Sequence, residues 1–129
     1  MMKPRRILII EDDAEIRLIL EMSLKYSGGF EPILACDGVE GIETARREKP
    51  DLILLDALMP RMDGYAACRL IKHDESLKNI PVIFLTAKTG RKEIDRAIRA
   101  GACGYLTKPF DPLQLAAEID KIVEGATGT

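Results

Sequence analysis

The chain has 129 residues, 47% of them hydrophobic and 31% charged, which is typical of one globular domain with a single core. A formal net charge of −2 provides no general attraction to polyphosphate, so we expect no nucleic-acid binding through this chain alone. No apolar run approaches the length that crosses a bilayer, so we expect no membrane insertion. Three cysteines, Cys36, Cys68 and Cys103, lie far apart beside apolar residues, which predicts reduced, partly buried thiols and a cytoplasmic location.

Five short apolar runs predict five β-strands, over residues 7–10, 33–35, 52–55, 82–85 and 105–106. The strongest runs are continuously apolar, as expected for a parallel sheet with helices on both faces. The pattern therefore predicts a doubly wound α/β fold, with five helices around a five-stranded parallel sheet in the flavodoxin-like order 2-1-3-4-5. We place the domain at residues 3–124 and a C-terminal tail at residues 125–129.

Apolar residues at helical spacing mark the face that each expected helix buries. In chain order these faces contain Ile16, Ile19, Leu20 and Ser23; Val39, Ile42 and Ala45; residues 65–72; Ile94, Ala97, Ile98 and Gly101; and Leu115, Ile119, Ile122 and Val123.

Turn-forming and capping residues bound several of these helices. Gly28 and Gly29 end the first helix, and Asp37 with Gly38 starts the second. We assign Asp13 to capping the first helix rather than to metal binding.

A second turn follows the third strand. Pro60 fixes the backbone there, Asp63 is a candidate cap for the third helix, and Gly64 is expected to permit an unusual dihedral angle.

Polar residues follow four of the five strands, where the core does not require them. Glu11 and Asp12 follow the first strand, Asp56 the third, Thr86 the fourth and Lys108 the fifth. The carboxyl ends of parallel strands meet at one edge of the sheet, and ligands bind there where the strand order reverses. The sequence therefore predicts that these side chains converge.

Three carboxylates in one crevice repel one another unless a cation is present or a pKa rises. Mg²⁺ fits such a site, because it typically takes one or two carboxylates together with water and phosphate oxygens. The only histidine, His73, falls near a helix end, so zinc ligation is not expected. Lys108 and the Thr86 hydroxyl suit phosphate oxygens, and Asp56 is the candidate oxygen nucleophile for phosphoryl transfer.

Each of these residues also has an ordinary structural interpretation. Glu11 and Lys108 taken alone are surface charges, Asp56 ends a strand, Thr86 is a β-branched strand residue and Tyr105 a half-buried aromatic. The joint placement of the charged residues favours a functional site. The basic residues of the fourth helix favour a solvated face rather than a docking surface: Arg91, Lys92, Arg96 and Arg99.

Four segments in this order, ILIIEDD (7–13), LILLDALMPRMDG (52–64), VIFLTA (82–87) and GYLTKPF (104–110), resemble the receiver domains of two-component response regulators. The resemblance covers nearly the whole chain. It implies a signalling domain rather than an enzyme, in which a histidine kinase or histidine phosphotransfer protein phosphorylates Asp56.

The resemblance also assigns individual roles. It gives Asp12 direct contact with a metal and Glu11 contact through water, with further ligands from Asp56 and the backbone carbonyl of Leu58. The ion is Mg²⁺, with Mn²⁺ as an alternative. Thr86 and Lys108 contact the phosphoryl group, and Thr86 and Tyr105 switch the face formed by the fourth helix, fifth strand and fifth helix. The Lys108–Pro109 bond is often cis in this family.

The sequence indicates less about the oligomeric state and the downstream target of the chain. Where transcription-factor receivers pair through a charged face, this chain has Cys103 and Gly104 before the switch aromatic and Glu118 at a usually basic position. We therefore expect a monomer or a weak phosphorylation-dependent dimer, with an unknown downstream protein as target. Leu58 cannot orient attacking water and Lys88 screens the approach, which predicts slow loss of the phosphoryl group.

Two other classes explain less of the sequence. An aspartate-based phosphohydrolase normally has a second aspartate where this chain has Leu58. A flavin-binding (FMN) electron carrier of flavodoxin-like topology needs a Ser/Thr/Gly-rich phosphate loop where this chain has acids.

Overall fold

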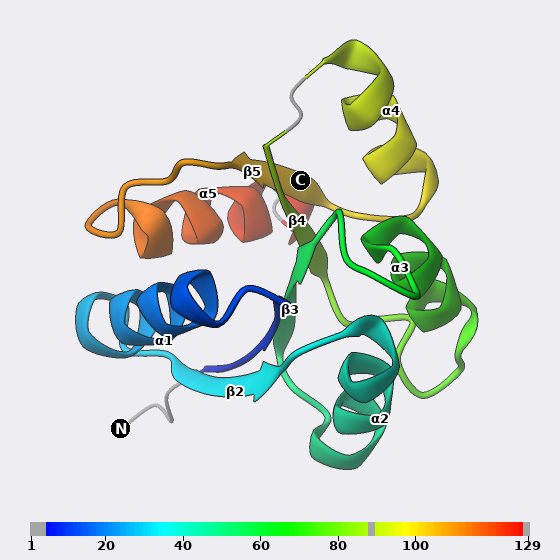
Figure 1. Cartoon of the computed structure of the whole chain (residues 1–129), viewed down its shortest axis with the longest axis horizontal. Coiled ribbons are helices and arrows are strands. Elements are labelled where there is room, and N and C mark those ends of the chain that lie inside the picture. Colours follow the sequence, from blue (N-terminus) through cyan, green and yellow to red (C-terminus); the bar gives the residue numbers. More distant parts are fainter. Residues whose placement is uncertain (1–4, 88–89, 128–129) are drawn as a thin grey trace.

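The computed structural model describes residues 5–87 and 90–127, in which strands and helices alternate along the chain (Figure 1). The elements are β1 (Arg6–Ile10), α1 (Ala14–Ser27), β2 (Glu31–Ala35), α2 (Gly38–Glu48), β3 (Leu52–Asp56), α3 (Gly64–His73), β4 (Val82–Thr86), α4 (Arg91–Arg99), β5 (Gly104–Thr107) and α5 (Leu115–Thr127).

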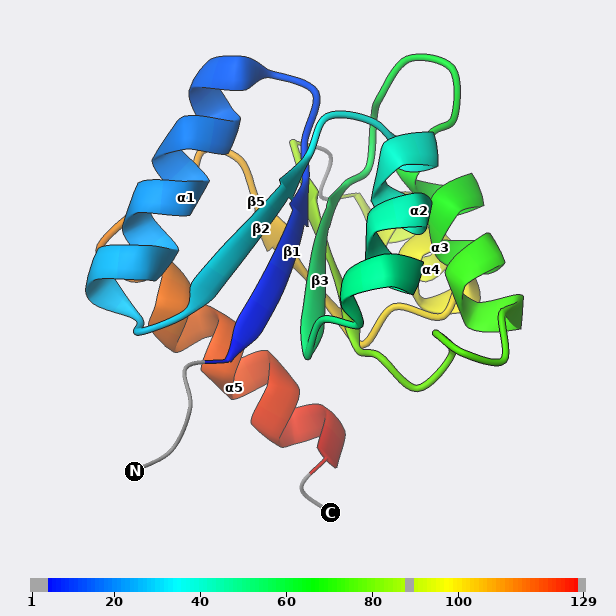
Figure 2. The same ribbon diagram turned by 90° about the horizontal axis from the view of Figure 1, so that it is seen from below.

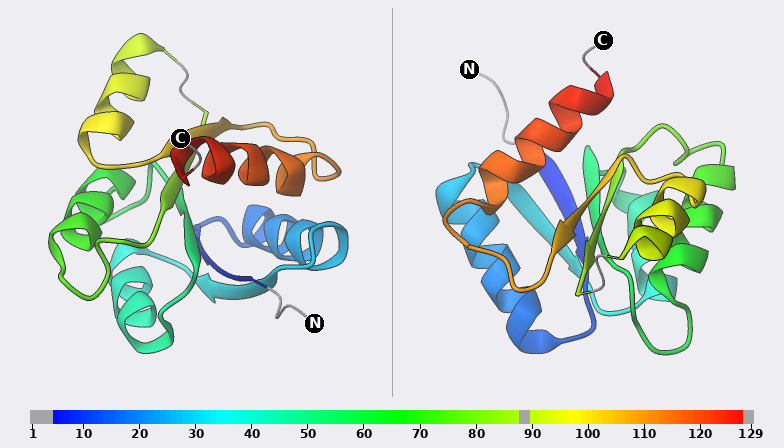
Figure 3. Two further views of the ribbon diagram at one scale, coloured as in Figure 1. Left: turned by 180° about the vertical axis from the view of Figure 1, so that it is seen from behind. Right: turned by 90° about the horizontal axis from the view of Figure 1, so that it is seen from above.

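The five strands form one parallel sheet in the order β2-β1-β3-β4-β5, which confirms the predicted topology. The helices cover both faces of this sheet: Figure 2 shows α1 and α5 on one side and α2, α3 and α4 on the other. Figure 3 shows α1 and α5 side by side from two further directions. Because both faces are covered, β1, β3 and β4 are almost wholly buried, as their continuous apolar sequence predicted.

Two core clusters fill the spaces on either side of the sheet. One lies under α2, α3 and α4 and includes Leu55, Tyr65 and Phe84. The other lies under α1 and α5 and includes Ile9 and Leu24. Alternate residues of each central strand serve the two clusters, since successive side chains point to opposite faces.

The expected helix faces were too broad: Gly101 is exposed and lies beyond the end of α4, and three apolar side chains are exposed as well. Ile19, Val39 and Ile98 are exposed by 45%, 47% and 61%, whereas α1 buries Leu20 and Leu24. Adjacent residues on a helix point about 100° apart, so an apolar neighbour of a buried residue need not reach the core.

Three aspartates cap helices. Asp13 accepts hydrogen bonds from the amides of residues 15 and 16, Asp37 from the amide of Glu40 and Asp63 from the amide of residue 66. The capping assignments of Asp13 and Asp63 are therefore confirmed. Gly28 is the C-cap of α1, as its position after the helical pattern predicted.

The expectation for Gly64 is wrong, because Gly64 does not have a positive φ. The positive-φ residues among those described are Gly29, Lys49, Arg61 and Gly101. A Cβ atom on Gly64 would lie 2.2 Å from the backbone oxygen of Asp56. Gly64 is therefore needed for close approach of two backbone segments, not for its conformational freedom.

Two further expectations need correction. Cys68 is buried and Cys103 half-buried, but Cys36 is exposed, because it lies in the turn that follows β2. Residues 125–127 continue α5, although we expected them in a tail. Among the described residues, none of the helices has both the length and the apolar character needed to span a membrane.

Candidate functional site

The polar residues that follow the strands line one cavity at the carboxyl edge of the sheet. It has a volume of about 210 Å³, and its lining residues are Glu11, Asp12, Asp13, Ile16, Asp56, Leu58, Thr86, Ala87 and Lys108. The reversal of strand order between β1 and β3 places this cavity where the α/β rule predicts a ligand. All the expected charged residues meet here.

Three carboxylates form the acidic part of the cavity. One oxygen from each of Glu11, Asp12 and Asp56 lies within 4.8 Å of the others. Glu11 and Asp56 are 1% and 5% exposed, whereas Asp12 is exposed. Burial of two anions beside a third is unfavourable without a compensating cation, so this arrangement indicates a site for one.

Lys108 provides part of that compensation. Its Nζ atom lies 2.8 Å from Glu11 Oε1 and 3.4 Å from Asp56 Oδ1. Burial alone lowers the pKa of Lys108, but the hydrogen bond to Glu11 and the charges of Asp56 and Glu11 outweigh it, so the pKa is raised. Lys108 is therefore a fixed positive charge at the cavity.

The pKa of Asp56 is raised to about 7. Burial is the main cause, the adjacent Glu11 acts in the same direction, and Lys108 opposes the shift. One lysine does not offset the combined effect of burial and two neighbouring acids. A divalent cation in contact with these oxygens favours the ionised form, and the oxygen-only donor set suits a hard ion such as Mg²⁺.

Main-chain hydrogen bonds hold the strand ends that carry these side chains. The Glu11 amide donates to the Ala35 carbonyl at 3.1 Å, which ties the end of β1 to β2. The Ala57 amide donates to Leu85 at 3.1 Å, and the Lys108 amide donates to Thr86 at 2.9 Å. Glu11, Asp56 and Lys108 are thus placed by the sheet rather than by a free loop.

The loop after β3 is fixed by the close approach of Gly64. The Gly64 amide donates to the Ala57 carbonyl at 2.9 Å, and the Leu58 amide donates to Asp56 Oδ1 at 3.3 Å. Leu58 is half exposed and lines the cavity. The role of its carbonyl as a metal ligand stays a prediction.

Thr86 and Tyr105, the two expected switch residues, lie differently. Thr86 is 6% exposed and lines the cavity. Tyr105 is half-buried, pairs with Phe84 across β4 and β5, and borders a groove between β5 and α5 instead. The structure therefore brings Thr86 to the site and places Tyr105 outside the cavity, on the neighbouring strand β5.

Three other expectations concern residues near the site. Asp13 lines the cavity but caps α1, which supports its exclusion from the ligand set. His73 lies at the end of α3, where its Nδ1 atom is 2.8 Å from the Arg69 carbonyl oxygen. The Lys108–Pro109 bond is cis, as the resemblance implied. Lys88 lies outside the described residues.

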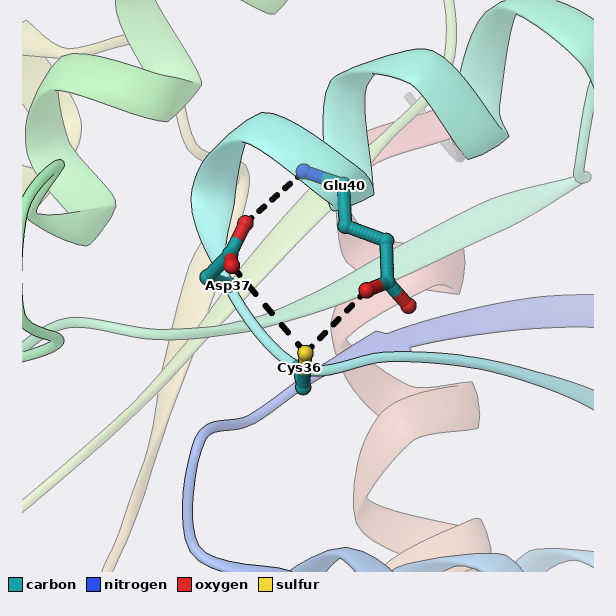
Figure 4. A group of neighbouring side chains, drawn as sticks. All are labelled: Cys36, Asp37 and Glu40. Atoms are coloured by element: carbon teal, nitrogen blue, oxygen red, sulfur yellow. Dashed lines mark hydrogen bonds between the residues drawn. The ribbon is translucent and has the colours of Figure 1, made fainter.

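A second group of metal-type side chains, which sequence analysis did not identify, consists of Cys36, Asp37 and Glu40 (Figure 4). Most of their interactions are with one another, and Arg61 Nη1 lies 4.0 Å from an Asp37 carboxylate oxygen. The Cys36 thiol donates to Glu40 at 3.1 Å, and Asp37 accepts the Glu40 amide at 2.8 Å as the cap of α2. The hydrogen bond to Glu40, with a smaller contribution from burial, raises the pKa of the Cys36 thiol. Capping of α2 accounts for Asp37, and the hydrogen bond from the Cys36 thiol accounts for the Glu40 carboxylate.

The residues that sequence analysis missed border the cavity on its apolar side. An apolar groove of about 470 Å³ shares Ile16, Ala87 and Lys108 with the acidic cavity and continues over Ile19, Pro109, Phe110 and Pro112. The apolar neighbours of the site motifs were the available signal, but only the fold shows that α1 and the loop before α5 meet there.

Fold and site together define a doubly wound α/β domain with an acidic, oxygen-rich cavity at the switch point of its sheet. The chain belongs to the response regulator receiver domain family, whose model matches residues 7–120.

Similar proteins agree with this assignment. The chain is 37% identical over 122 residues (95% of this chain) to a probable transcriptional regulator ycf27 of Porphyridium aerugineum, of which the match covers 49%. It is 39% identical over 116 residues (88% of this chain) to the response regulator PleD of Caulobacter vibrioides, of which the match covers 25%. The chain thus spans half or less of the length of these curated relatives.

Solved structures have the same fold. Vibrio cholerae chemotaxis protein CheY4 superposes with a TM-score of 0.87 at 28% identity, over 92% of this chain and 98% of that one. The receiver domain of the sensor histidine kinase PA1611 of Pseudomonas aeruginosa gives 0.82 at 32% identity, over 98% and 99%. That structure is described with a magnesium ion coordinated in its active site cleft.

Proposed function

We propose that Asp56 is the phosphoacceptor of this receiver domain. The observation that carries the proposal is the position of the Asp56 carboxylate, which is buried at the end of β3 between two acids and the Lys108 ammonium. The two acids suit a cation, and the cation and Lys108 neutralise the oxygens of an incoming phosphoryl group. A phosphohydrolase or a flavin carrier does not account for this combination.

Glu11, Asp12, Asp56 and the backbone carbonyl of Leu58 would hold the metal ion, with Mg²⁺ as the expected ion and Mn²⁺ as an alternative. When bound, the ion supplies positive charge to the phosphoryl oxygens. The oxygen donor set of this cavity and the magnesium site described for the PA1611 receiver support this assignment.

The transfer step balances without a general base. An oxygen of the ionised Asp56 carboxylate attacks phosphorus, the P–N bond to the donor histidine breaks, and its electron pair returns to the imidazole. The product is an acyl phosphate on Asp56. Lys108 keeps its proton and turns from Asp56 to a phosphoryl oxygen, while the Thr86 hydroxyl donates to another.

The phosphodonor is a sensor histidine kinase or a histidine phosphotransfer protein, and we propose that it seats in the apolar groove beside the cavity. This groove shares Lys108 with the cavity, and its lining includes the exposed Ile19 and the half-buried Phe110. An apolar helix that carries the phosphohistidine would bury these side chains and present phosphorus to Asp56. Exchange of Ile19 for glutamate should then impair phosphorylation by protein donors and leave phosphorylation by small donors unchanged.

The output surface is the face formed by α4, β5 and α5. A phosphoryl group on Asp56 draws Thr86 toward it, and Tyr105 turns toward the space behind, which shifts an existing equilibrium of that face. A downstream protein reads this change. The chain itself contacts no nucleic acid and acts as a monomer or a weak phosphorylation-dependent dimer. We place the receiver domain at residues 3–124 and its site of action in the cytoplasm.

The decisive experiment is incubation with a small phosphodonor, with and without Mg²⁺, followed by measurement of intact mass. The wild type should gain one phosphoryl group only with Mg²⁺, and Asp56→Asn should gain none. Asp13→Asn is the matched control, since that carboxylate lines the same cavity but caps α1, and it should still be modified. An unmodified wild type, or an adduct that persists in Asp56→Asn, contradicts the proposal.

A second experiment tests the donor groove. Ile19→Glu should retain phosphorylation by the small donor and lose most phosphorylation by a histidine kinase that modifies the wild type. Ile98→Glu, at an exposed isoleucine of α4 outside the groove, is the control and should behave as the wild type with both donors.

A further inference from the structure

We propose that Arg17 is a positioning residue that holds the segment of residues 11–13 in the conformation that a divalent cation requires. This inference rests on the metal assignment of the proposed function and extends it to a residue outside the ligand set. Arg17 lies in α1, and its side chain is half-buried.

The contacts of Arg17 reach back to the acidic segment. Its Nη1 atom donates to the backbone oxygen of Glu11 at 2.8 Å and lies 3.4 Å from the backbone oxygen of Asp12. Both contacts go to main-chain carbonyls rather than to carboxylates. The guanidinium therefore holds the peptide groups that orient the ligand side chains, and it occupies none of the carboxylate oxygens itself.

The other hydrogen bonds of residues 11–13 fix the two end residues, Glu11 and Asp13. The Glu11 amide is bonded to β2, Glu11 Oε2 accepts the Asp13 amide at 3.1 Å, and the Asp13 side chain caps α1. Asp12 lies between them, is exposed, and is repelled by two neighbouring carboxylates. Rotation of the Asp12 peptide would let its side chain turn into solvent. The Arg17 contact with the Asp12 carbonyl opposes that rotation.

A positioning role and a simple charge effect predict opposite results for metal binding. If Arg17 acts only as a nearby positive charge, its removal reduces repulsion of the cation and tightens Mg²⁺ binding. If Arg17 positions the ligands, its removal weakens Mg²⁺ binding, because the carboxylates must be reordered when the ion binds. The sign of the change therefore identifies the role.

The test is calorimetric titration of the full chain with Mg²⁺, a measurement that requires no phosphodonor. Arg17→Met should weaken Mg²⁺ binding by about tenfold, the lower end of the range for residues that orient metal ligands. Arg17→Lys keeps the charge but not the planar guanidinium that places Nη1 near both carbonyls, and its Mg²⁺ affinity should fall between those of Arg17→Met and the wild type. Arg47→Met removes an exposed charge that pairs with the adjacent Glu48, and should leave Mg²⁺ affinity unchanged.

The possible outcomes distinguish the metal site from the positioning role of Arg17. Equal or tighter Mg²⁺ binding by Arg17→Met, or wild-type affinity in both Arg17 variants, overturns the positioning role while the metal site stands. An absence of Mg²⁺ binding by the wild type overturns the metal site and the role of Arg17 together. Circular dichroism establishes whether each variant is folded. If Arg17→Met is unfolded, the Mg²⁺ affinity of Arg17→Lys still tests the positioning role.

Discussion

The connections after β3 and after β4 both leave the acidic cavity, yet they lead to helices that are attached to the core very differently. Helix α3 buries half of its residues: Gly64, Tyr65, Ala67, Cys68 and Ile71. Helix α4 buries Ala97 alone and lies at the outer end of its layer (Figure 1). The side of the cavity that carries Asp56 is thus packed tightly, and the side that continues to the proposed output face is packed lightly.

This difference suits the two tasks assigned to the domain. Phosphoryl transfer depends on fixed positions of charged groups, which the buried ends of β1 and β3 provide. A change of state depends on an element that costs little to displace, and elements with few buried contacts are the ones that move most readily. The contrast therefore predicts where substitutions damage the fold and where they change only the state of the domain.

The largest expected effect comes from truncating the buried face of α3. Ile71 is fully buried, so Ile71→Ala should lower the free energy of unfolding by about 2–5 kcal/mol. The matched change in α4, Ile98→Ala, removes a side chain that is 61% exposed and should cost less than about 0.5 kcal/mol. Urea denaturation measures both. Equal losses would mean that α4 is held as firmly as α3.

The next largest effect should come from the close approach of α3 to Asp56, the proposed phosphoacceptor. Gly64→Ala places a methyl group against the backbone of Asp56 and should cost about 1–3 kcal/mol and slow phosphorylation. Gly90→Ala, at the cap of α4, meets only the end of the Glu93 side chain and should cost less than about 1 kcal/mol. Denaturation and the rate of adduct formation test the pair. A normal phosphorylation rate in a folded Gly64→Ala variant would contradict this coupling.

A smaller effect is expected at Arg96, which links the two helices. Its guanidinium lies 4.1 Å from the centre of the Tyr65 ring and 3.6 Å from Asp63, the cap of α3. Cation–π and exposed ion-pair contacts together suggest a loss of about 1 kcal/mol for Arg96→Met. Arg91→Met, at the first residue of α4, is the control and should change the free energy of unfolding by less than about 0.5 kcal/mol. If the two variants are equally stable, the Arg96 contacts do not hold α4.

The sequence was sufficient to predict the fold and the cavity, because both follow from local patterns. Continuous apolar runs specify buried parallel strands, and parallel strands bring their carboxyl ends to one edge of the sheet, so Glu11, Asp56 and Lys108 were expected at that edge. The preference for Asp13 as a cap also followed from its place before a helix. These inferences required no knowledge of how distant segments touch.

The wrong predictions concern features that depend on contacts between segments distant in sequence. The small size of Gly64 is needed at a neighbouring strand end, which its dihedral angles do not reveal. The periodicity of α4 indicated a buried Ile98, but periodicity does not specify how far a helix stands from the sheet. Arg17 was missed for the same reason, since contacts with backbone carbonyls leave no mark in the choice of neighbouring residues.

The smallest expected change in stability concerns Leu58, the exposed residue of the loop between β3 and α3. Leu58→Asn should alter the free energy of unfolding by less than about 0.5 kcal/mol, because the side chain is half exposed. It should nevertheless shorten the lifetime of the acyl phosphate, since an amide beside the cavity can orient an attacking water and leucine cannot. Leu70→Asn, on α3 and equally exposed, is the control and should leave the lifetime unchanged. The rate at which the modified protein releases inorganic phosphate measures this lifetime. Slower release from Leu58→Asn than from the wild type would show that Leu58 does not protect the acyl phosphate from water.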